Sequence, residues 1–236
     1  MQHTKARPIG RPVDLAKNLA ILNAARKLLF RDGPRLFSVQ AVAHAAGVSK
    51  VTVYARHGSR EALLHAVIGQ LAQELSAAFD RRPGDACALR ASLIEFGQGL
   101  LKFMIGTEHI GLMRSLLGSG AGSASALRGV FRRGPAAMLL RVSAWLAECH
   151  REGALHCPVP ERSAETLLGM LQGLALVRAM YGAVNAESKR DVEAHVIFAV
   201  EVFLQAHRVE PTRRSAFGGA VATGSGRAAL RPCRAR

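Results

Sequence analysis

The residues best suited to metal or redox chemistry lie close together in the second half of the chain. Cys149 and His150 are followed by His156 and Cys157, so two thiols and two imidazoles fall within nine residues. Adjacent residues on a helix point about 100° apart, and a turn expected at Gly153 separates the two pairs, so the spacing disfavours a tetrahedral metal site. We expect a helix C-terminus capped at Gly153 and no metal or cofactor, with oxidant sensing by the two thiols as the alternative.

Sequence motifs of enzymes are missing. The run of small residues at 118–123 is not a GxGxxG motif, lacks the lysine of a phosphate-binding P-loop and follows no predicted strand. The chain also has neither a GxSxG nucleophile motif nor an HExxH zinc motif. We therefore expect a flexible linker at 118–123 and a protein that is not an enzyme.

A different chemistry is indicated by the short segment that begins at Ser49. Ser49 is a good helix N-cap, and the backbone N–H groups behind it suit a phosphate. Lys50, Thr52 and Tyr54 would point outward with hydrogen-bond donors and an aromatic edge, whereas Val53 would face the core. Donors on a helix that enters a major groove can read base edges. The segment therefore predicts DNA recognition.

Two further helices must position this segment. From Asp14, apolar residues recur at spacings of three and four, which predicts an amphipathic helix ending near Gly33. Ser38 can cap a second, short helix that ends at Gly47. A short helix, a turn containing glycine and the helix at Ser49 form the helix-turn-helix arrangement, whose second helix can enter a major groove.

The composition agrees with a helical protein that contacts a polyanion. The 236 residues carry 32 Lys and Arg against 17 Asp and Glu, a formal net charge of +15, and 49% are hydrophobic, mainly Ala and Leu. Residues 1–68 hold 11 basic and 3 acidic side chains, residues 69–210 hold 15 and 14, and residues 211–236 hold 6 and none. This distribution predicts an all-α protein with a DNA-binding head, a neutral helical body and a disordered basic tail.

The sequence also bears on the compartment. The first residues are polar and basic and lack the apolar stretch of a secretion signal. The longest apolar segment, Leu167–Val184, is interrupted by Gln172 and Arg178, so we expect a buried helix and no membrane contact. Four cysteines without a CxxC pair are typical of a reducing compartment. We therefore expect a cytoplasmic protein.

Residues 21–67 resemble the DNA-binding head of the TetR (tetracycline repressor) family. The resemblance rests on SVQAVAHAAGVSKVTVY at 38–54 and on GSREALL at 58–64. A weaker likeness to a common regulatory subtype of this family continues to about residue 184. The resemblance implies an N-terminal three-helix DNA-binding head and a C-terminal helical domain for regulation and dimerisation. His57 departs from the family, whose members usually carry an aromatic ring there; we expect its polar atoms to be satisfied, with a pH-sensitive imidazole as the alternative.

These observations predict four segments and a set of helices. The segments are a flexible basic arm at 1–12, the helix-turn-helix domain at 13–60, the ligand-binding and dimerisation domain at 61–210, and the disordered basic tail at 211–236. Beyond the head, apolar periodicity and breaks predict helices at 61–80, 88–105, 109–117, 124–133, 135–152, 161–182 and 188–209. The last two are apolar on more than one face, and the resemblance implies that they pair with a second copy of the chain.

The function expected from the resemblance is ligand-responsive regulation of transcription. The protein would be a repressor that binds an inverted-repeat operator in double-stranded DNA as a homodimer and is released by a small molecule. The alternatives are a small-molecule or thiol-sensing helical protein with only non-specific DNA binding, and a nucleoid-type binder driven by charge alone. The candidate DNA-binding residues are Lys5, Arg7, Arg11, Ser38, Ser49, Lys50, Val51, Thr52, Tyr54, Arg56 and Arg60.

Roles for these residues follow from matching positions in the family motif. Lys50 and Tyr54 would contact base edges and Val51 a thymine methyl group, while Thr52, Arg56 and Arg60 would contact phosphates. The arm residues Lys5, Arg7 and Arg11 would reach a neighbouring stretch of backbone or the minor groove. An effector cavity would be lined by apolar side chains with a few polar groups, although packing of the helical core explains the same residues equally well. The candidate lining residues are Phe96, Phe103, Met104, His109, Met113, Met138, Trp145 and Gln172.

Overall fold

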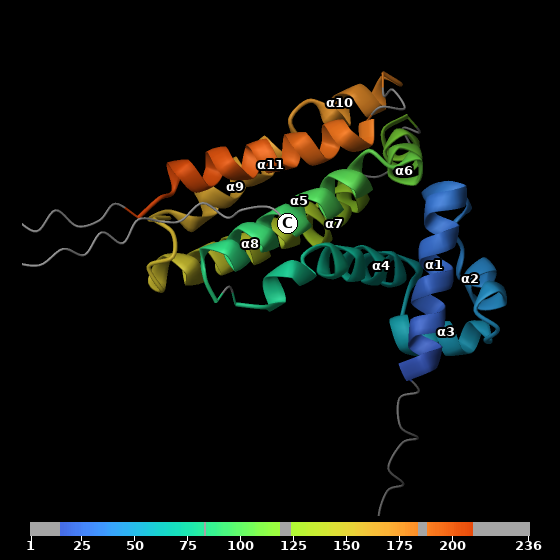
Figure 1. The fold of residues 1–236 in the computed structure, drawn as a ribbon. Coiled ribbons are helices and arrows are strands. Elements are labelled where there is room, and N and C mark those ends of the chain that lie inside the picture. Colours follow the sequence, from blue (N-terminus) through green and yellow to red (C-terminus); the bar gives the residue numbers. More distant parts are fainter. Residues whose placement is uncertain (1–14, 83, 119–123, 184–187, 210–236) are drawn as a thin grey trace, which may run out of the picture. The chain divides into compact units, whose positions relative to one another are not determined.

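The computed structural model describes residues 15–82, 84–118, 124–183 and 188–209. Within these ranges every regular element is a helix (Figure 1), which confirms the all-α prediction. The elements are α1 (Leu15–Leu36), α2 (Val39–Ala45), α3 (Lys50–His57), α4 (Arg60–Leu75), the 3₁₀ helix η1 (Ala77–Asp80), α5 (Ala86–Met104), α6 (Thr107–Gly118), α7 (Ala124–Arg133), α8 (Pro135–Arg151), α9 (Pro160–Gln172), α10 (Ala175–Met180) and α11 (Ser188–Ala206).

Side-chain caps explain where the helices around the predicted recognition segment begin. The Oγ atoms of Ser38 and Ser49 each accept a hydrogen bond at 3.1 Å from the backbone N–H three residues later, which confirms both predicted caps. Ser59 does the same for α4 at 3.0 Å. A capping oxygen satisfies an N–H group that has no partner inside the helix. These hydroxyl groups therefore set the starts of α2, α3 and α4.

Two predicted helices are each divided. The helix expected at 61–80 ends at Leu75 and is followed by η1, and the helix expected at 161–182 is broken after Gln172. At the second break Gly173 has φ 45°, a region that favours glycine. His195 of α11 donates from Nε2 to the carbonyl oxygens of Met170 and Leu171, at 3.0 and 3.2 Å. Hydrophobic periodicity does not predict this break, because the segments before and after Gly173 continue the same apolar pattern.

The chain divides into two compact units. The head unit comprises the described residues of 1–74, 103–138 and 176–183, and the body unit comprises those of 75–102, 139–175 and 184–236. Within the head unit, α1 packs on α2 and α6, and α2 packs on α3. The ring of Phe103 lies 6.0 Å from that of Phe30, edge to face, and 4.4 Å from that of His109. Helix α6 therefore belongs with the head.

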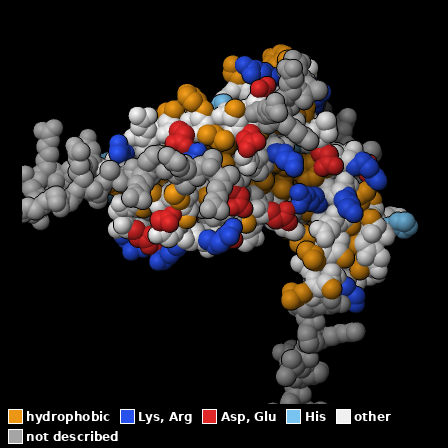
Figure 2. All heavy atoms as spheres, viewed as in Figure 1, with side chains coloured by type: hydrophobic (Ala, Val, Ile, Leu, Met, Phe, Trp, Pro, Cys, Tyr) orange, Lys and Arg blue, Asp and Glu red, His pale blue; other side chains and the backbone are white. Residues whose placement is uncertain are grey.

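The body unit is built around closely packed helices with paired surface charges. A Cβ atom added at Gly97 of α5 would lie 2.7 Å from side-chain atoms of both Leu171 and Val196, so α5 approaches α9 and α11 closely. Its surface pairs Arg82 with Glu148 and Arg90 with Glu201, at 2.9 and 2.5 Å, and Figure 2 shows basic and acidic side chains interspersed on the visible face. None of the described helices is long and apolar enough to cross a membrane.

Candidate DNA-binding site

Helix α3 presents apolar and aromatic side chains to solvent. Val53 is 1% exposed, whereas Val51 is 76% and Tyr54 50% exposed. A helix of eight residues that served packing alone would turn such side chains inward, because burial of a valine side chain stabilises a protein by about 1.5–3 kcal/mol. The orientations of Val53 and Tyr54 are those that the sequence predicts.

Lys50 is joined to the preceding helix. Its Nζ atom donates to Oε1 of Gln40 on α2 at 2.7 Å, and both side chains are exposed. The bond places an ammonium group and a carboxamide side by side on the surface of the helix-turn-helix. Sequence reasoning missed Gln40, because a spacing of ten residues across a turn does not reveal that the two side chains meet.

Two other candidate residues have clear structural contacts. Arg60 donates from Nε to the carbonyl oxygen of Phe37 at 2.7 Å, and its guanidinium carbon lies 5.7 Å from the centre of the Phe37 ring. The Oγ atom of Ser49 lies 2.9 Å from Oγ1 of Thr52, in addition to capping α3. Arg60 therefore ties the start of α4 to the segment between α1 and α2, and Thr52 is oriented by the cap.

The expectation that His57 has satisfied polar atoms is wrong. Its Nε2 atom is buried and has no hydrogen-bond partner in the described part of the chain. Burial lowers the pKa of His57 below its ordinary value, and the positive charge of Arg56 lowers it further. The neutral imidazole is therefore favoured in the folded head. Of the remaining DNA-binding candidates, Lys5, Arg7 and Arg11 lie outside the described residues, as does the predicted tail.

Comparison with known proteins places this geometry in a family. Residues 21–67 match the family model for bacterial regulatory proteins of the tetR family, and residues 91–209 match the model for the C-terminal domain of AefR-like transcriptional repressors. The chain belongs to the TetR family. Its family and fold are those of transcriptional regulators. A search of curated proteins finds no match.

Solved structures agree with this TetR-family assignment. A Mesorhizobium loti protein described as a TetR-family regulator is 22% identical, with a TM-score of 0.64, and the match covers 84% of this chain and 99% of that one. A TetR regulator from Agrobacterium tumefaciens is 26% identical, with a TM-score of 0.64, covering 82% and 95%. The flavonoid-responsive regulator FrrA is 25% identical, with a TM-score of 0.58, covering 80% and 96%.

The candidate effector residues of this TetR-family chain fall into two groups. Phe103, Met104, His109, Met113 and Met138 lie in the head unit, where the rings of Phe103 and His109 are in contact and Nδ1 of His109 is buried without a partner among the described residues. The body unit holds the others, which are Phe96, Trp145 and Gln172.

In the body unit, the candidate residues Phe96 and Trp145 both contact the ring of Phe79. The ring of Phe79, on η1, lies 4.6 Å from that of Phe96 and 4.7 Å from that of Trp145, between ring centres. Phe79 was not predicted, because η1 was expected to be the end of a long helix. Gln172 is partly exposed at the end of α9.

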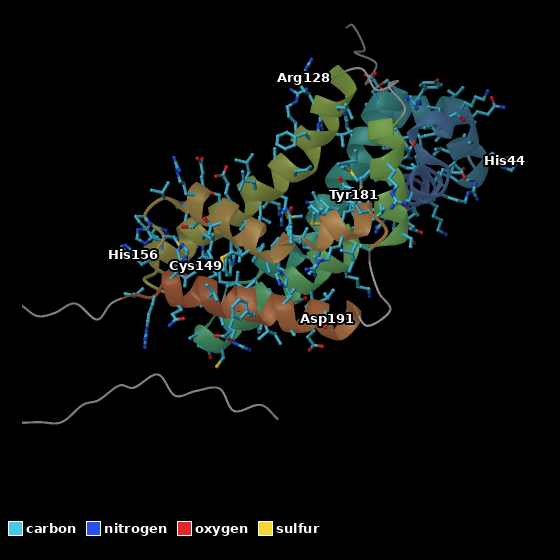
Figure 3. All side chains as sticks on the ribbon, turned by 90° about the horizontal axis from the view of Figure 1, so that it is seen from above. His44, Arg128, Cys149, His156, Tyr181 and Asp191 are labelled. Atoms are coloured by element: carbon cyan, nitrogen blue, oxygen red, sulfur yellow. The ribbon has the colours of Figure 1, made fainter. Side chains whose placement is uncertain are left out.

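Cys149, near the end of α8 (Figure 3), and Cys157, which precedes α9, are both buried and are called here the buried thiol pair. Helix α8 ends at Arg151, and Gly153 follows with φ 73°, as predicted. Burial and the neighbouring Cys157 raise the pKa of Cys149 to about 12, and burial also raises the pKa of Cys157. No group of three or more His, Cys, Asp or Glu side chains in the described ranges could hold a metal ion.

Proposed function

We propose that the protein is a ligand-responsive repressor that binds an inverted-repeat operator as a homodimer and leaves it when a small molecule binds. The observation that carries the proposal is the exposed face of α3, where Val51 and Tyr54 lie in solvent and Lys50 is held beside Gln40. Apolar and donor groups on one short, capped helix suit a major groove, which displays thymine methyl groups and hydrogen-bond acceptors.

Each exposed group has a proposed partner in DNA. Lys50 and Tyr54 would contact base edges, Val51 a thymine methyl group, and Arg56 and Arg60 phosphates. Gln40 joins this set through its bond to Lys50, and a carboxamide can pair with adenine. The capped start of α3 adds backbone N–H groups that suit a phosphate. The arm at 1–12 and the tail at 211–236 would add sequence-independent contacts.

A second copy of the chain would complete the regulator. On α11, Phe198 is 68% and Val202 38% exposed, and residues four apart lie on the same face of a helix. Pairing of this face with its copy would bury the two side chains and produce a two-fold dimer with two recognition helices. Sedimentation analysis tests this: a change of Phe198→Glu should shift the protein toward monomers, and an unchanged mass would exclude this face.

The effector and the compartment are also proposals. FrrA is described as flavonoid-responsive, which makes flavonoids reasonable first compounds for an effector screen with this chain. We propose that the protein acts in the cytoplasm on the DNA that is present there. Release of a DNA probe from the protein by a flavonoid would identify flavonoids as an effector class. If no flavonoid of the panel releases the probe, flavonoids are excluded and other compounds are screened.

Selection of bound sequences from random DNA tests the central proposal. A regulator of this type should enrich an inverted repeat, whereas a charge-driven nucleoid-type binder should enrich no sequence. Lys50→Ala should weaken binding to the selected site about tenfold or more and binding to random DNA much less, because a base contact contributes about 1–3 kcal/mol. Lys102→Ala, which removes an exposed lysine of α5, is the matched control. Equal losses on both DNAs would exclude base reading by Lys50.

The thiol-sensing alternative is disfavoured by the buried thiol pair. Thiolates are the species that react with oxidants, and a raised pKa leaves little thiolate near neutral pH. Cys149, with its pKa raised to about 12, is therefore a poor sensor.

A further inference from the structure

Helix α7 presents an exposed aromatic ring beside two arginines. Phe131 is 60% exposed, and Arg128 and Arg132 are also exposed. At about 100° per residue, these three positions span about 100° of the helix circumference. Side chains three and four residues apart start about 5–6 Å from each other on a helix, and Figure 3 shows Arg128 pointing outward from α7. The three side chains therefore form one surface, which we call the α7 face.

The opposite side of α7 packs within the head unit. A Cβ atom added at Gly129 would lie 2.6 Å from Nε2 of His65, so α7 approaches α4 closely at this position. Phe131 follows two residues later and therefore points about 200° away from Gly129. Leu127 and Val130 are partly buried, whereas Phe131 is exposed. Packing of α7 on α4 therefore does not explain Phe131.

The positive charge of the α7 face is not neutralised by the described residues. Helix α7 contains no Asp or Glu, and no ion pair joins Arg128 or Arg132 to a carboxylate in the described ranges. By contrast, Arg26 on α1 pairs with Glu74 of α4 at 2.6 Å. Like charges four residues apart on a helix repel one another and destabilise it. An anion bound by both guanidinium groups would remove this repulsion.

The α7 face suits a chain that carries both phosphates and flat rings. The planar guanidinium of arginine matches the geometry of a phosphate, and an exposed aromatic side chain provides a surface on which a nucleobase stacks. Single-stranded RNA offers both groups, because its loops and ends expose unpaired bases. A lipid surface would require several apolar side chains. Phe131 is the one exposed apolar group among the described side chains of α7, which favours RNA.

We propose that the α7 face binds single-stranded RNA, with a base stacked on Phe131 and neighbouring phosphates held by Arg128 and Arg132. Every base has a face that can stack, so the site should accept any sequence. This contact goes beyond the proposed function, because it adds RNA as a partner and uses neither α3 nor the operator. It requires no change in the fold, since all three side chains are already exposed.

Two labelled oligonucleotides of about twelve nucleotides test the role of the base. One is oligouridine, and the other is an abasic chain with the same number of phosphates. Fluorescence anisotropy measures both affinities in an excess of unlabelled duplex DNA, which occupies α3. Oligouridine should bind about tenfold more tightly than the abasic chain, because stacking contributes to one complex alone. Equal affinities, or displacement of oligouridine by the duplex, would overturn the proposal.

Single substitutions assign the binding to the α7 face. Phe131→Ala removes the ring, so the ratio of the two affinities should fall to about one. Arg128→Ala and Arg132→Ala should weaken binding of both oligonucleotides, and each should lower the salt dependence by about 0.7 ions. Tyr181→Ala, which removes an 85% exposed ring of the head unit, is the matched control and should change neither value.

The contrary results for these variants are equally specific. A ratio that persists in Phe131→Ala, or that falls equally in Tyr181→Ala, would exclude Phe131 as the stacking residue. Arginine variants with the salt dependence of the parent protein would exclude the phosphate contacts. Far-UV circular dichroism establishes that each variant is folded.

Photochemical crosslinking locates the base without any variant. Irradiation of 5-iodouridine within the oligonucleotide links it to a nearby aromatic side chain, and mass spectrometry identifies the modified peptide. In the full chain, the peptide that contains Phe131 should carry the label. Labelling of other peptides alone would place the base at another site and overturn the proposal, and this readout decides the question even if Phe131→Ala does not fold.

A lipid partner and a failure of the proposed function give different results. Cosedimentation with phosphatidylglycerol vesicles that is lost in Phe131→Ala, together with equal affinities for the two oligonucleotides, would identify a membrane surface and overturn the RNA proposal. Selection from random duplex DNA contains no RNA. An enriched inverted repeat without selective oligouridine binding would therefore remove this inference alone, whereas selective oligouridine binding without an enriched repeat would remove the proposed regulator alone.

Discussion

Replacement of Arg60 by alanine is expected to destabilise the head unit as well as to weaken DNA binding. The guanidinium donates to the carbonyl oxygen of Phe37 at 2.7 Å and lies over the Phe37 ring. A hydrogen bond from a charged donor contributes about 1.5–3 kcal/mol, and the lower end applies because Arg60 is exposed. The cation–π contact adds about 0.5 kcal/mol. The expected loss is about 2 kcal/mol, or about 4–8 °C in Tm for a chain of this size.

Three variants separate the structural role of Arg60 from its proposed phosphate contact. Urea unfolding followed by circular dichroism should show the full decrease in the free energy of unfolding in Arg60→Ala. Arg60→Lys should show most of that decrease, because it keeps the charge but has no Nε–H donor. Arg132→Ala, at an exposed position of α7, should stay within about 0.5 kcal/mol of the parent protein. If Arg60 also contacts a phosphate, the salt dependence of DNA binding should decrease by about one ion in Arg60→Ala and persist in Arg60→Lys. Equal urea midpoints for Arg60→Ala and Arg132→Ala would refute the reasoning.

Three further predictions concern a histidine, a glycine and the buried thiol pair. Because burial lowers the pKa of His57, the unfolded chain takes up its proton first as the pH falls below about 6.5; stability should therefore decrease on acidification, and His57→Phe should weaken that decrease in urea titrations. Gly97→Ala should be about 1–3 kcal/mol less stable than Gly99→Ala, because a Cβ at Gly97 meets side chains at 2.7 Å and none lies within 4 Å of Gly99. Cys87 is exposed and should react with a thiol reagent at pH 8 much faster than the buried thiol pair.

Each of these predictions has a clear contrary result. An unaltered pH dependence in His57→Phe would mean that other groups control the stability of the head in acid. Equal stability of the two glycine variants would mean that the packing around α5 relaxes without cost. Rapid modification of the buried thiol pair in folded protein would restore the thiol-sensing alternative.

Local patterns in the sequence were sufficient to predict the helix caps and the buried side of α3 in the head. Ser38 and Ser49 act on backbone groups only three residues away, so their caps could be assigned from neighbouring residues. The same holds for the inward turn of Val53, which follows from helical periodicity. The family resemblance of residues 21–67 rests on this local order and is confirmed.

Long-range contacts explain what the sequence did not show. Gln40 contacts Lys50 and Phe79 contacts Trp145, each on another helix, and the spacing of these residues in the sequence indicates neither contact. The effector candidates were chosen by residue type, and their distribution over the two units depends on how distant segments pack. Likewise, the unpaired Nε2 of His57 depends on the surroundings of the ring, which sequence periodicity does not describe.

The residues along the chain were enough to predict an all-helical TetR-family regulator with a short helix capped by Ser49, because helix caps, periodicity and charge act over a few neighbouring positions. The packed structure alone decided that Arg60 braces the head, that α6 belongs with it, and that Nε1 of Trp145 meets no acceptor among the described residues. These properties depend on which groups meet across tens of residues. Only the tertiary structure fixes the distance between such groups, and therefore whether a hydrogen bond forms between them.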